Sequence, residues 1–431
     1  MRQSHLTAID ADAWPGVAWV PTGRIIGIRA RLAEASFARA CADAGLDLDI
    51  NGSPDLIVEE EELFSRIAIS GWLGLAEGYL AGEWRAEKLA DVLEALLRSD
   101  YHPRVPLGHR KMSPRRFQGG ELPADLVRLS SGDGMSAFGG VFASGVPTTV
   151  RTAVPSFVSG HKGPQTHFVD LTTFSDPVAA ERDDLRDAQD RSVEMLLDAA
   201  RVSAGTHLLE YPGTGGSIAI GATHRRATVD TLTADPDYAR AVEERLTLAG
   251  VAESVQTSVI ARPIPGPREW RGNYDAIVSV ERLEVLSARE RVVLIRSLDR
   301  LLTIGGLAAI QTVVATDSMT QAAQASLGVL SAYIWPGLNY PGAQDIHRLA
   351  DRESGLRIIG QTHVGNHAKI SLGMQRSIFD GQTREAAAAG FDPVFRRLWD
   401  YQFALREALF RLGMLDVVQF TLTHRDRRGR R

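Results

Sequence analysis

The chain has 431 residues, of which 44% are hydrophobic and 23% charged, and at about 100–200 residues per domain this length predicts two or three domains. Its 48 Lys and Arg residues against 53 Asp and Glu give a formal net charge of -5, which excludes the overall basic field of a dedicated nucleic-acid-binding protein. The single cysteine, Cys41, excludes an internal disulfide framework and any zinc site with two or more cysteine ligands.

The sequence shows no targeting or membrane-spanning segment. No apolar run reaches the about 18 residues that a membrane-spanning helix needs. The opening stretch MRQSHLTAIDADAW lacks the basic and then apolar layout of a signal peptide. We therefore expect a cytoplasmic protein that is at most peripheral to the inner face of the membrane.

Residues 1–125 are expected to form a small α+β domain. Apolar residues recur every three or four positions in ARLAEASFARACADAGL (30–46) and in KLADVLEALLRS (88–99), which predicts two amphipathic helices. Cys41 lies between alanines in the first of these helices and is expected to be a small buried hydrophobic side chain.

Residues 126–180 have the composition of a connector. Gly, Pro, Ser and Thr dominate GGVFASGVPTTVRTAVPSFVSGHKGPQTH (139–167), which shows almost no helical or strand periodicity. Loops of this length are usually functional or mobile. His161 and His167 flank GPQT, but no carboxylate or third histidine stands at ligand spacing, so solvent-facing histidines are favoured over a metal site.

Residues 181–431 alternate predicted helices with predicted strands, a pattern typical of a doubly wound parallel α/β sheet. The predicted strands are HLLEY (207–211), ATVDTLT (227–233), YDAIVSV (274–280) and GLAAIQTVV (306–314). The predicted helices are residues 184–202, 217–226, 237–250 and 290–302.

A glycine-rich turn, EYPGTGG (210–216), follows the first of these strands and opens a helix. That placement suits a nucleotide-binding loop, because backbone N–H groups can meet a ligand at a helix N-terminus. A tight turn without a ligand is the alternative. The candidate cofactor-binding residues come from this turn and from the next strand: Glu210, Gly213, Thr214, Gly215, Gly216, Thr231 and Thr233.

Several segments between Phe64 and Thr423 together resemble one known family. They are GWLGLAEGYLAGEW (71–84), YDAIVSVERLE (274–284), SAYIWPG (331–337), HAKISL (367–372) and FRRLWDYQFALREALFRLGMLDVVQFTLTH (395–424). The chain is similar in them to the cyclopropane fatty acid synthases and to the related enzymes that make 10-methyl branched acids. The resemblance implies a C-terminal Rossmann-like methyltransferase domain and a smaller N-terminal lipid-binding domain. It also implies S-adenosylmethionine as cofactor and unsaturated acyl chains of phospholipids as substrate.

The resemblance also assigns two active-site residues. It places the family's catalytic glutamate on Glu284 and its catalytic tyrosine on Tyr333, beside a bicarbonate ion that serves as base. From the residues alone, Glu284 is equally consistent with a solvated carboxylate or a helix cap. Core packing is the corresponding alternative for Tyr333.

Several positions depart from the family pattern. Counted back without gaps from VDLTTF, the family's H-Y-D-x-G-N cofactor loop falls on residues 151–156, where none of those side chains is present. By the same count the bicarbonate-binding cysteine becomes Leu171, and a histidine of some members becomes Gln311. Pro212 replaces the first glycine of the turn and removes an N–H donor.

These losses, at Ala153, Ser156 and Pro212, predict S-adenosylmethionine binding at about 100 μM or weaker. The alternative to an active enzyme is therefore a catalytically silent homologue that binds lipid or an active paralogue. A fold recruited for another small molecule is a third alternative.

Two basic clusters predict contact with an anionic phospholipid membrane surface. HRKMSPRR (109–116) precedes the connector, and RDRRGRR (425–431) ends the sequence. Each arginine or lysine near such a surface contributes about 1 kcal/mol. A solvated linker and a disordered tail are the alternatives. A homo-oligomer or an active paralogue is the expected protein partner.

Overall fold

A computed structural model describes residues 4–49, 52–105, 121–158, 165–181, 183–262 and 264–425. The chain divides into two compact units, each built from separate stretches of sequence. The first unit comprises Met1–Arg116, Ser318–Pro336 and Phe379–Met414, and the second comprises Phe117–Asp317, Gly337–Ile378 and Leu415–Arg431. These units differ from the expected domains, because two C-terminal stretches complete the N-terminal unit.

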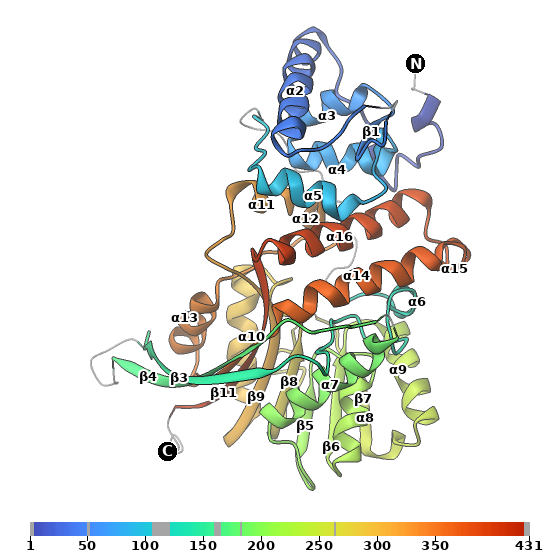
Figure 1. Cartoon of the computed structure of the whole chain (residues 1–431). Helices are drawn as coiled ribbons and strands as arrows, with labels where there is room; N and C mark the ends of the chain where they lie inside the picture. Colours follow the sequence, from blue (N-terminus) through green and yellow to red (C-terminus); the bar gives the residue numbers. More distant parts are fainter. Residues whose placement is uncertain are drawn as a thin grey trace. The chain divides into compact units, whose positions relative to one another are not determined.

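The first unit is helical (Figure 1). Its α-helices are α1 (Pro15–Ala18), α2 (Arg24–Asp43), α3 (Glu62–Ser70), α4 (Trp72–Ala81), α5 (Leu89–Arg98), α11 (Gln321–Ser326), α12 (Gly328–Tyr333), α15 (Thr383–Ala388) and α16 (Pro393–Arg411). A 3-10 turn, η1, covers Ser4–Leu6. The expected α+β character reduces to β1 (Ile57–Val58) paired with β2 (Trp84–Arg85).

The core of the first unit explains why distant segments join it. Trp14 is fully buried, and its indole Nε1 donates to Asp392 Oδ2 at 2.7 Å. Asp392 also caps α16, accepting from the Phe395 N–H at 2.7 Å. A buried ion pair between Arg66 and Glu83 lies in the same unit, at 2.8 Å. Cys41 is buried, as predicted.

The second unit is α/β, as expected from the sequence, with a mixed sheet of nine strands. Its strands are β3 (Pro147–Pro155), β4 (Thr166–Phe174), β5 (His207–Glu210), β6 (Thr228–Thr233), β7 (Val255–Val259), β8 (Tyr274–Val280), β9 (Leu302–Ala315), β10 (Leu356–His363) and β11 (Leu415–His424). They are ordered β3-β4-β10-β11-β9-β8-β5-β6-β7. The five strands from β9 to β7 run parallel, whereas β11 runs antiparallel to β9 and to β10.

Helices cover both faces of this sheet (Figure 1). The covering helices are α7 (Asp184–Ala199), α8 (Ser217–His224), α9 (Pro236–Leu248), α10 (Ala288–Leu301) and α13 (Ala343–Glu353). The unit also contains α6 (Ala124–Arg128), α14 (Gly365–Gly381) and a 3-10 turn η2 at Ala252–Ser254. Neighbouring residues of β5 point to opposite faces, since Leu208 packs with α7, α8 and α9 and Leu209 packs with α10 and α13.

The expected connector is partly wrong, because β3 and β4 form a regular antiparallel pair at the edge of the sheet (Figure 1). Their register runs from Pro147 opposite Phe174 to Pro155 opposite Thr166. Nearly every residue of β3 is exposed. With no buried face, the strand carries no alternation of apolar and polar residues for a sequence pattern to reveal.

The order of the strands reverses beside β5. The chain adds β6 and β7 on one side of β5 and then adds β8 and β9 on the other. Ligands of open α/β sheets bind in the crevice outside the carboxyl ends of the strands at such a reversal. The residues that follow β5, β6 and β8 are therefore the candidates for a ligand-binding site.

Candidate functional site

The glycine-rich turn lies at this reversal, between the end of β5 and the start of α8. Gly215 and Gly216 have φ angles of 72° and 89°, a left-handed conformation that favours glycine. Gly216 is the N-cap of α8. The Gly213 N–H donates to the Leu232 carbonyl of β6 at 2.9 Å. The structure thus brings the predicted turn, the helix N-terminus and β6 together.

Glu210, the last residue of β5, is fully buried beneath the turn. Its Oε1 accepts from the Thr214 N–H at 2.7 Å and from the Thr214 hydroxyl. Burial raises the pKa of the Glu210 carboxyl, and the hydrogen bonds from Thr214 oppose that shift. Its Oε2 is buried and has no hydrogen-bond partner among the described residues.

Thr231 and Thr233 lie at the carboxyl end of β6 and are both buried. A Cβ atom on Gly213 would lie 3.0 Å from the Thr231 hydroxyl oxygen, so the turn packs closely against this strand. The Thr233 hydroxyl donates to the Glu121 carboxylate, which also accepts from the Ala234 N–H at 3.1 Å. Sequence reasoning missed Glu121.

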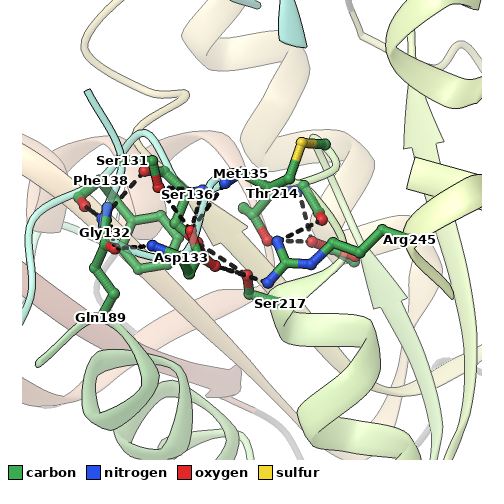
Figure 2. Close-up of polar contacts among 12 residues, drawn as sticks. Ser131, Gly132, Asp133, Met135, Ser136, Phe138, Gln189, Thr214, Ser217 and Arg245 are labelled. Atoms are coloured by element: carbon green, nitrogen blue, oxygen red, sulfur yellow. Dashed lines mark hydrogen bonds and ion pairs between the residues drawn. The ribbon is translucent and has the colours of Figure 1, made fainter. Parts of the chain in front are cut away.

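A segment of the expected connector, Ser131–Ser136, lies directly against the glycine turn. Figure 2 shows Asp133 directed toward Ser217, the first residue of α8, and toward Arg245 of α9. Asp133 Oδ2 accepts from the Ser217 hydroxyl and from the Arg245 guanidinium, each at 2.8 Å. Arg245 also donates to the Gly215 carbonyl at 2.9 Å.

The charge on Asp133 is strongly favoured. Its side chain is 1% exposed. Burial alone would raise its pKa, but Arg245 and the hydrogen bonds from Ser131 and the Met135 N–H hold the pKa well below its ordinary value. The site therefore places a carboxylate whose charged form is favoured at the N-terminus of α8, beside Arg245.

The backbone of this segment is fixed from α7 (Figure 2). The Gln189 side-chain oxygen accepts from the Gly132 N–H at 3.1 Å, and its nitrogen donates to the Phe138 carbonyl at 2.9 Å. A Cβ atom on Gly215 would lie 2.3 Å from the Met135 carbonyl oxygen, so only glycine fits there. The S-S-G-D-G-M-S sequence is typical of a turn braced by an aspartate, which is the signal that could have identified it.

The gap-free placement of the family's cofactor loop is wrong. Residues 151–155 lie in β3, and five strands separate β3 from β5 in the sheet. Ser156 follows β3, and its hydroxyl faces Asp351 at 3.4 Å. Leu171 lies in β4, paired with Val150 and Gln361. The side chains of residues 151–156 and of Leu171 therefore do not show which groups are present or missing at the glycine turn.

Glu284 follows β8 and is neither solvated nor a helix cap, so those alternatives are wrong. Its side chain is buried and accepts from the Thr312 hydroxyl at 2.7 Å and from the Val313 N–H at 3.3 Å. The helix that follows, α10, is capped instead by Ser287. Burial and the nearby Glu281 raise the pKa of Glu284 to about 7.

Gln311 of β9, at the position where some family members have a histidine, belongs to a buried polar network. Its Oε1 accepts from the Gln419 amide at 3.0 Å and from the Ser192 hydroxyl at 3.2 Å. The Gln311 carbonyl accepts from the Glu281 N–H at 2.8 Å, which ties this network to the turn that carries Glu284.

Tyr333 ends α12 in the first unit and is 1% exposed. Its hydroxyl donates to Glu77 Oε1 at 2.6 Å, and its ring lies 5.9 Å from that of Trp14. Burial raises the pKa of Glu77 to about 7, against the hydrogen bond from Tyr333. Glu284 belongs to the second unit, so the predicted pairing of Glu284 with Tyr333 stays a prediction.

The expectation that His167 faces solvent is wrong, because the side chain is buried. It is 8% exposed, and its Nε2 lies 3.0 Å from the Ile358 carbonyl oxygen. His161, residues 109–116 and residues 426–431 lie outside the described residues. Within the described ranges, no group of three His, Cys, Asp or Glu side chains is arranged to hold a metal ion.

The last described residue, Arg425, donates to the Asp351 carbonyl at 2.7 Å. Among the described residues, no helix has both the length and the apolar character needed to cross a membrane.

The sequence is similar to a known protein family and to a characterised relative. Residues 171–420 match the family model of mycolic acid cyclopropane synthetase. The chain is 30% identical over 435 residues to the tuberculostearic acid methyltransferase UfaA1 of Mycobacterium tuberculosis, covering 97% of both proteins.

Two solved structures share the fold. The cyclopropane synthase MmaA2 from Mycobacterium tuberculosis has a TM-score of 0.50 and 19% identity, covering 55% of this chain and 85% of that chain. The cyclase SpnF also has a TM-score of 0.50, at 15% identity, covering 73% of this chain and 98% of that chain. At these identities the likeness shows the fold alone.

Proposed function

Because the chain belongs to the mycolic acid cyclopropane synthetase family, we propose that it transfers a methyl or methylene group from S-adenosylmethionine to an unsaturated fatty acyl chain of a phospholipid. One observation carries the proposal. The glycine turn, the N-terminus of α8 and the buried Glu210 meet where the order of the strands reverses. The relative's activity on a fatty acid supports the acyl substrate.

The residues at the turn fit this cofactor. S-adenosylmethionine carries an ammonium group and ribose hydroxyls that need acceptors. Glu210 Oε2 is a buried carboxylate oxygen with no partner among the described residues, so it can supply one. When bound, the cofactor supplies an electrophilic methyl group.

Glu284 is the residue best suited to handle a proton. Addition of a methyl group to an alkene leaves a cation on the acyl chain, and completing the product requires removal of a proton. A carboxylate with a pKa of about 7 accepts a proton near neutral pH, and the Thr312 hydroxyl and Val313 N–H hold its two oxygens in place. A bicarbonate ion beside Glu284 stays a prediction.

The catalytically silent alternative stays a prediction beside this one. It rests on the missing side chains of the H-Y-D-x-G-N loop and on Pro212, although Ala153 and Ser156, where that loop was placed, do not belong to the glycine turn. Pro212 does lie in the turn, and the acidic residue that contacts adenine in the family is absent from SVIARPI (258–264). Binding of S-adenosylmethionine at about 100 μM or weaker stays a prediction. An active paralogue or a second copy as partner stays a prediction.

Two measurements test the proposal. Calorimetry of the purified protein with S-adenosylmethionine should give saturable binding. Incubation with vesicles of unsaturated phospholipid and methyl-labelled cofactor should place the label in the acyl chain, as read by mass spectrometry. Failure of both at millimolar cofactor would refute the proposed function, whereas binding without label transfer would favour the silent alternative.

A further inference from the structure

Helix α2 in the first unit presents an apolar stripe that nothing in the described chain covers. Ile25, Ile28 and Leu32 are 70%, 63% and 67% exposed. They stand three and four residues apart, which places them on one face of the helix. The buried residues of α2, Phe37 and Cys41, lie on the opposite face by the same period. Three large aliphatic side chains side by side in water are unusual for a surface helix.

Arginines lie on both sides of this stripe. Arg24 and Arg31 flank one side and Arg29 the other, by the helical period of 3.6 residues. All three are exposed, and none forms an ion pair with another described residue. An apolar face bordered by arginines is the pattern of a helix that lies in a membrane interface.

A cavity of about 610 Å³ adjoins the same helix, between α2, α3 and the chain that follows α5. Arg29, Arg39 and Arg104 contribute cationic side chains to its lining, and Leu32, Ile67 and Val105 contribute apolar ones. No carboxylate from the described residues lines it. Such a lining is complementary to a ligand that joins an anionic group to a hydrocarbon chain.

We propose that α2 is the membrane-docking helix of this protein, and that the adjoining cavity receives the phosphate of an anionic phospholipid. Ile25, Ile28 and Leu32 enter the acyl boundary, while Arg29, Arg39 and Arg104 hold the headgroup phosphate. This inference deepens the proposed function, since it names the surface through which the protein reaches a membrane-bound acyl chain. Charge favours a lipid over a second copy, because a self-paired α2 would bring arginines against arginines.

Vesicle sedimentation tests the proposal independently of catalysis. The probes are phosphatidylcholine vesicles with and without phosphatidylglycerol, at low and at high salt. The wild-type protein should bind the anionic vesicles and be released by salt. The triple variant Arg29→Gln, Arg39→Gln, Arg104→Gln should bind about 100-fold more weakly, from about 1 kcal/mol per charge and about 1.4 kcal/mol per tenfold.

The apolar stripe needs its own variants and controls. The triple variant Ile25→Gln, Ile28→Gln, Leu32→Gln keeps good helix formers and should weaken vesicle binding at least tenfold. Leu248→Gln, at an 89% exposed leucine of α9, and Arg289→Gln, at an exposed arginine of α10, are matched controls that should bind as wild type does. Thermal unfolding checks that each variant keeps its fold.

Several outcomes would overturn the proposal. Equal binding to both kinds of vesicle, or wild-type binding by either triple variant, would refute it. Binding of inorganic phosphate without vesicle binding would show an anion site only. Loss of a dimer in the Ile25, Ile28 and Leu32 variant, with vesicle binding intact, would identify a second copy as the cover. Cofactor binding and label transfer to detergent-dispersed phospholipid are measured separately, so failure of docking is distinguishable from failure of the proposed function.

Discussion

Replacing Asp133 with asparagine should destabilise the second unit by about 3 kcal/mol. The Asp133 carboxylate accepts from two backbone N–H groups, Met135 at 2.9 Å and Ser136 at 2.7 Å, and from three serine hydroxyls. Asparagine keeps one acceptor oxygen but turns an NH2 group toward Arg245, which is itself a donor.

The magnitude follows from burial. Removing one partner of a buried ion pair costs about 3–5 kcal/mol. Because Arg245 is 23% exposed and can regain some hydration, the lower end applies. For a unit of this size, about 3 kcal/mol lowers the melting temperature by roughly 6–12 °C. Binding of S-adenosylmethionine should weaken as well, since segment Ser131–Ser136 packs against the glycine turn.

Thermal and denaturant unfolding measure the effect, and a double-mutant cycle with Arg245→Met isolates the interaction of the pair. The matched control is Asp237→Asn, whose partner Arg240 lies at 2.9 Å on the same helix as Arg245, with both side chains largely exposed. An exposed pair of this kind contributes less than about 1 kcal/mol. If Asp133→Asn costs no more than Asp237→Asn, the account of Asp133 as the residue that holds this segment is refuted.

The same pair predicts a dependence on pH. The pKa of Asp133 is lower in the folded state than in the unfolded chain, so the unfolded state binds more protons. Its contribution is therefore complete above an unfolded pKa of about 3.9 and is lost as pH falls below that value. Asp133→Asn should remove this part of the acid sensitivity, which unfolding at a series of pH values would reveal.

Three further predictions concern other residues. Gly215→Ala should destabilise the protein by about 2 kcal/mol more than Gly205→Ala, because both glycines have positive φ but only Gly215 faces a backbone oxygen at 2.3 Å; equal melting temperatures would contradict this. Glu77 has a folded pKa of about 7 against an ordinary 4.5, so stability should fall as pH rises between those values. Glu77→Gln should reduce the change of unfolding free energy with pH in this range. An unchanged pH dependence would show that another group is responsible for it. Glu284→Gln and Tyr333→Phe should each lower label transfer by about 100-fold, and full activity of the double variant would remove both from the mechanism.

Local sequence signals predicted the glycine turn well. A strand, a glycine-rich turn and a helix follow one another within a short stretch, and each has its own pattern of residues. Glu210, Thr214, Thr231 and Thr233 could be chosen because they are close to that turn along the chain or on the next strand.

Residues distant in sequence could not be predicted in the same way. Asp133 contacts Ser217 beside the turn, and Glu121 contacts Thr233 at the end of β6, each from more than 70 residues upstream, and no periodicity marks either one. The count that placed the cofactor loop at residues 151–156 assumed no insertion. Residues 151–155 instead form the edge strand β3, and because nearly all of β3 is exposed, its sequence has no alternating pattern that would have predicted a strand.

The composition of the first unit has a consequence for biosynthesis. Helices α1 to α5 leave the ribosome early, but the partner of Trp14, Asp392, is 378 residues further along. At about 5–20 residues per second, roughly 20–75 s pass between the synthesis of Trp14 and that of its partner in α16. During that time the apolar faces of α3, α4 and α5 lack a part of their native core. We therefore expect a protein truncated before α16 to have N-terminal helices that depend on chaperones. This should hold even though such a protein still contains every residue of the glycine turn in the second unit.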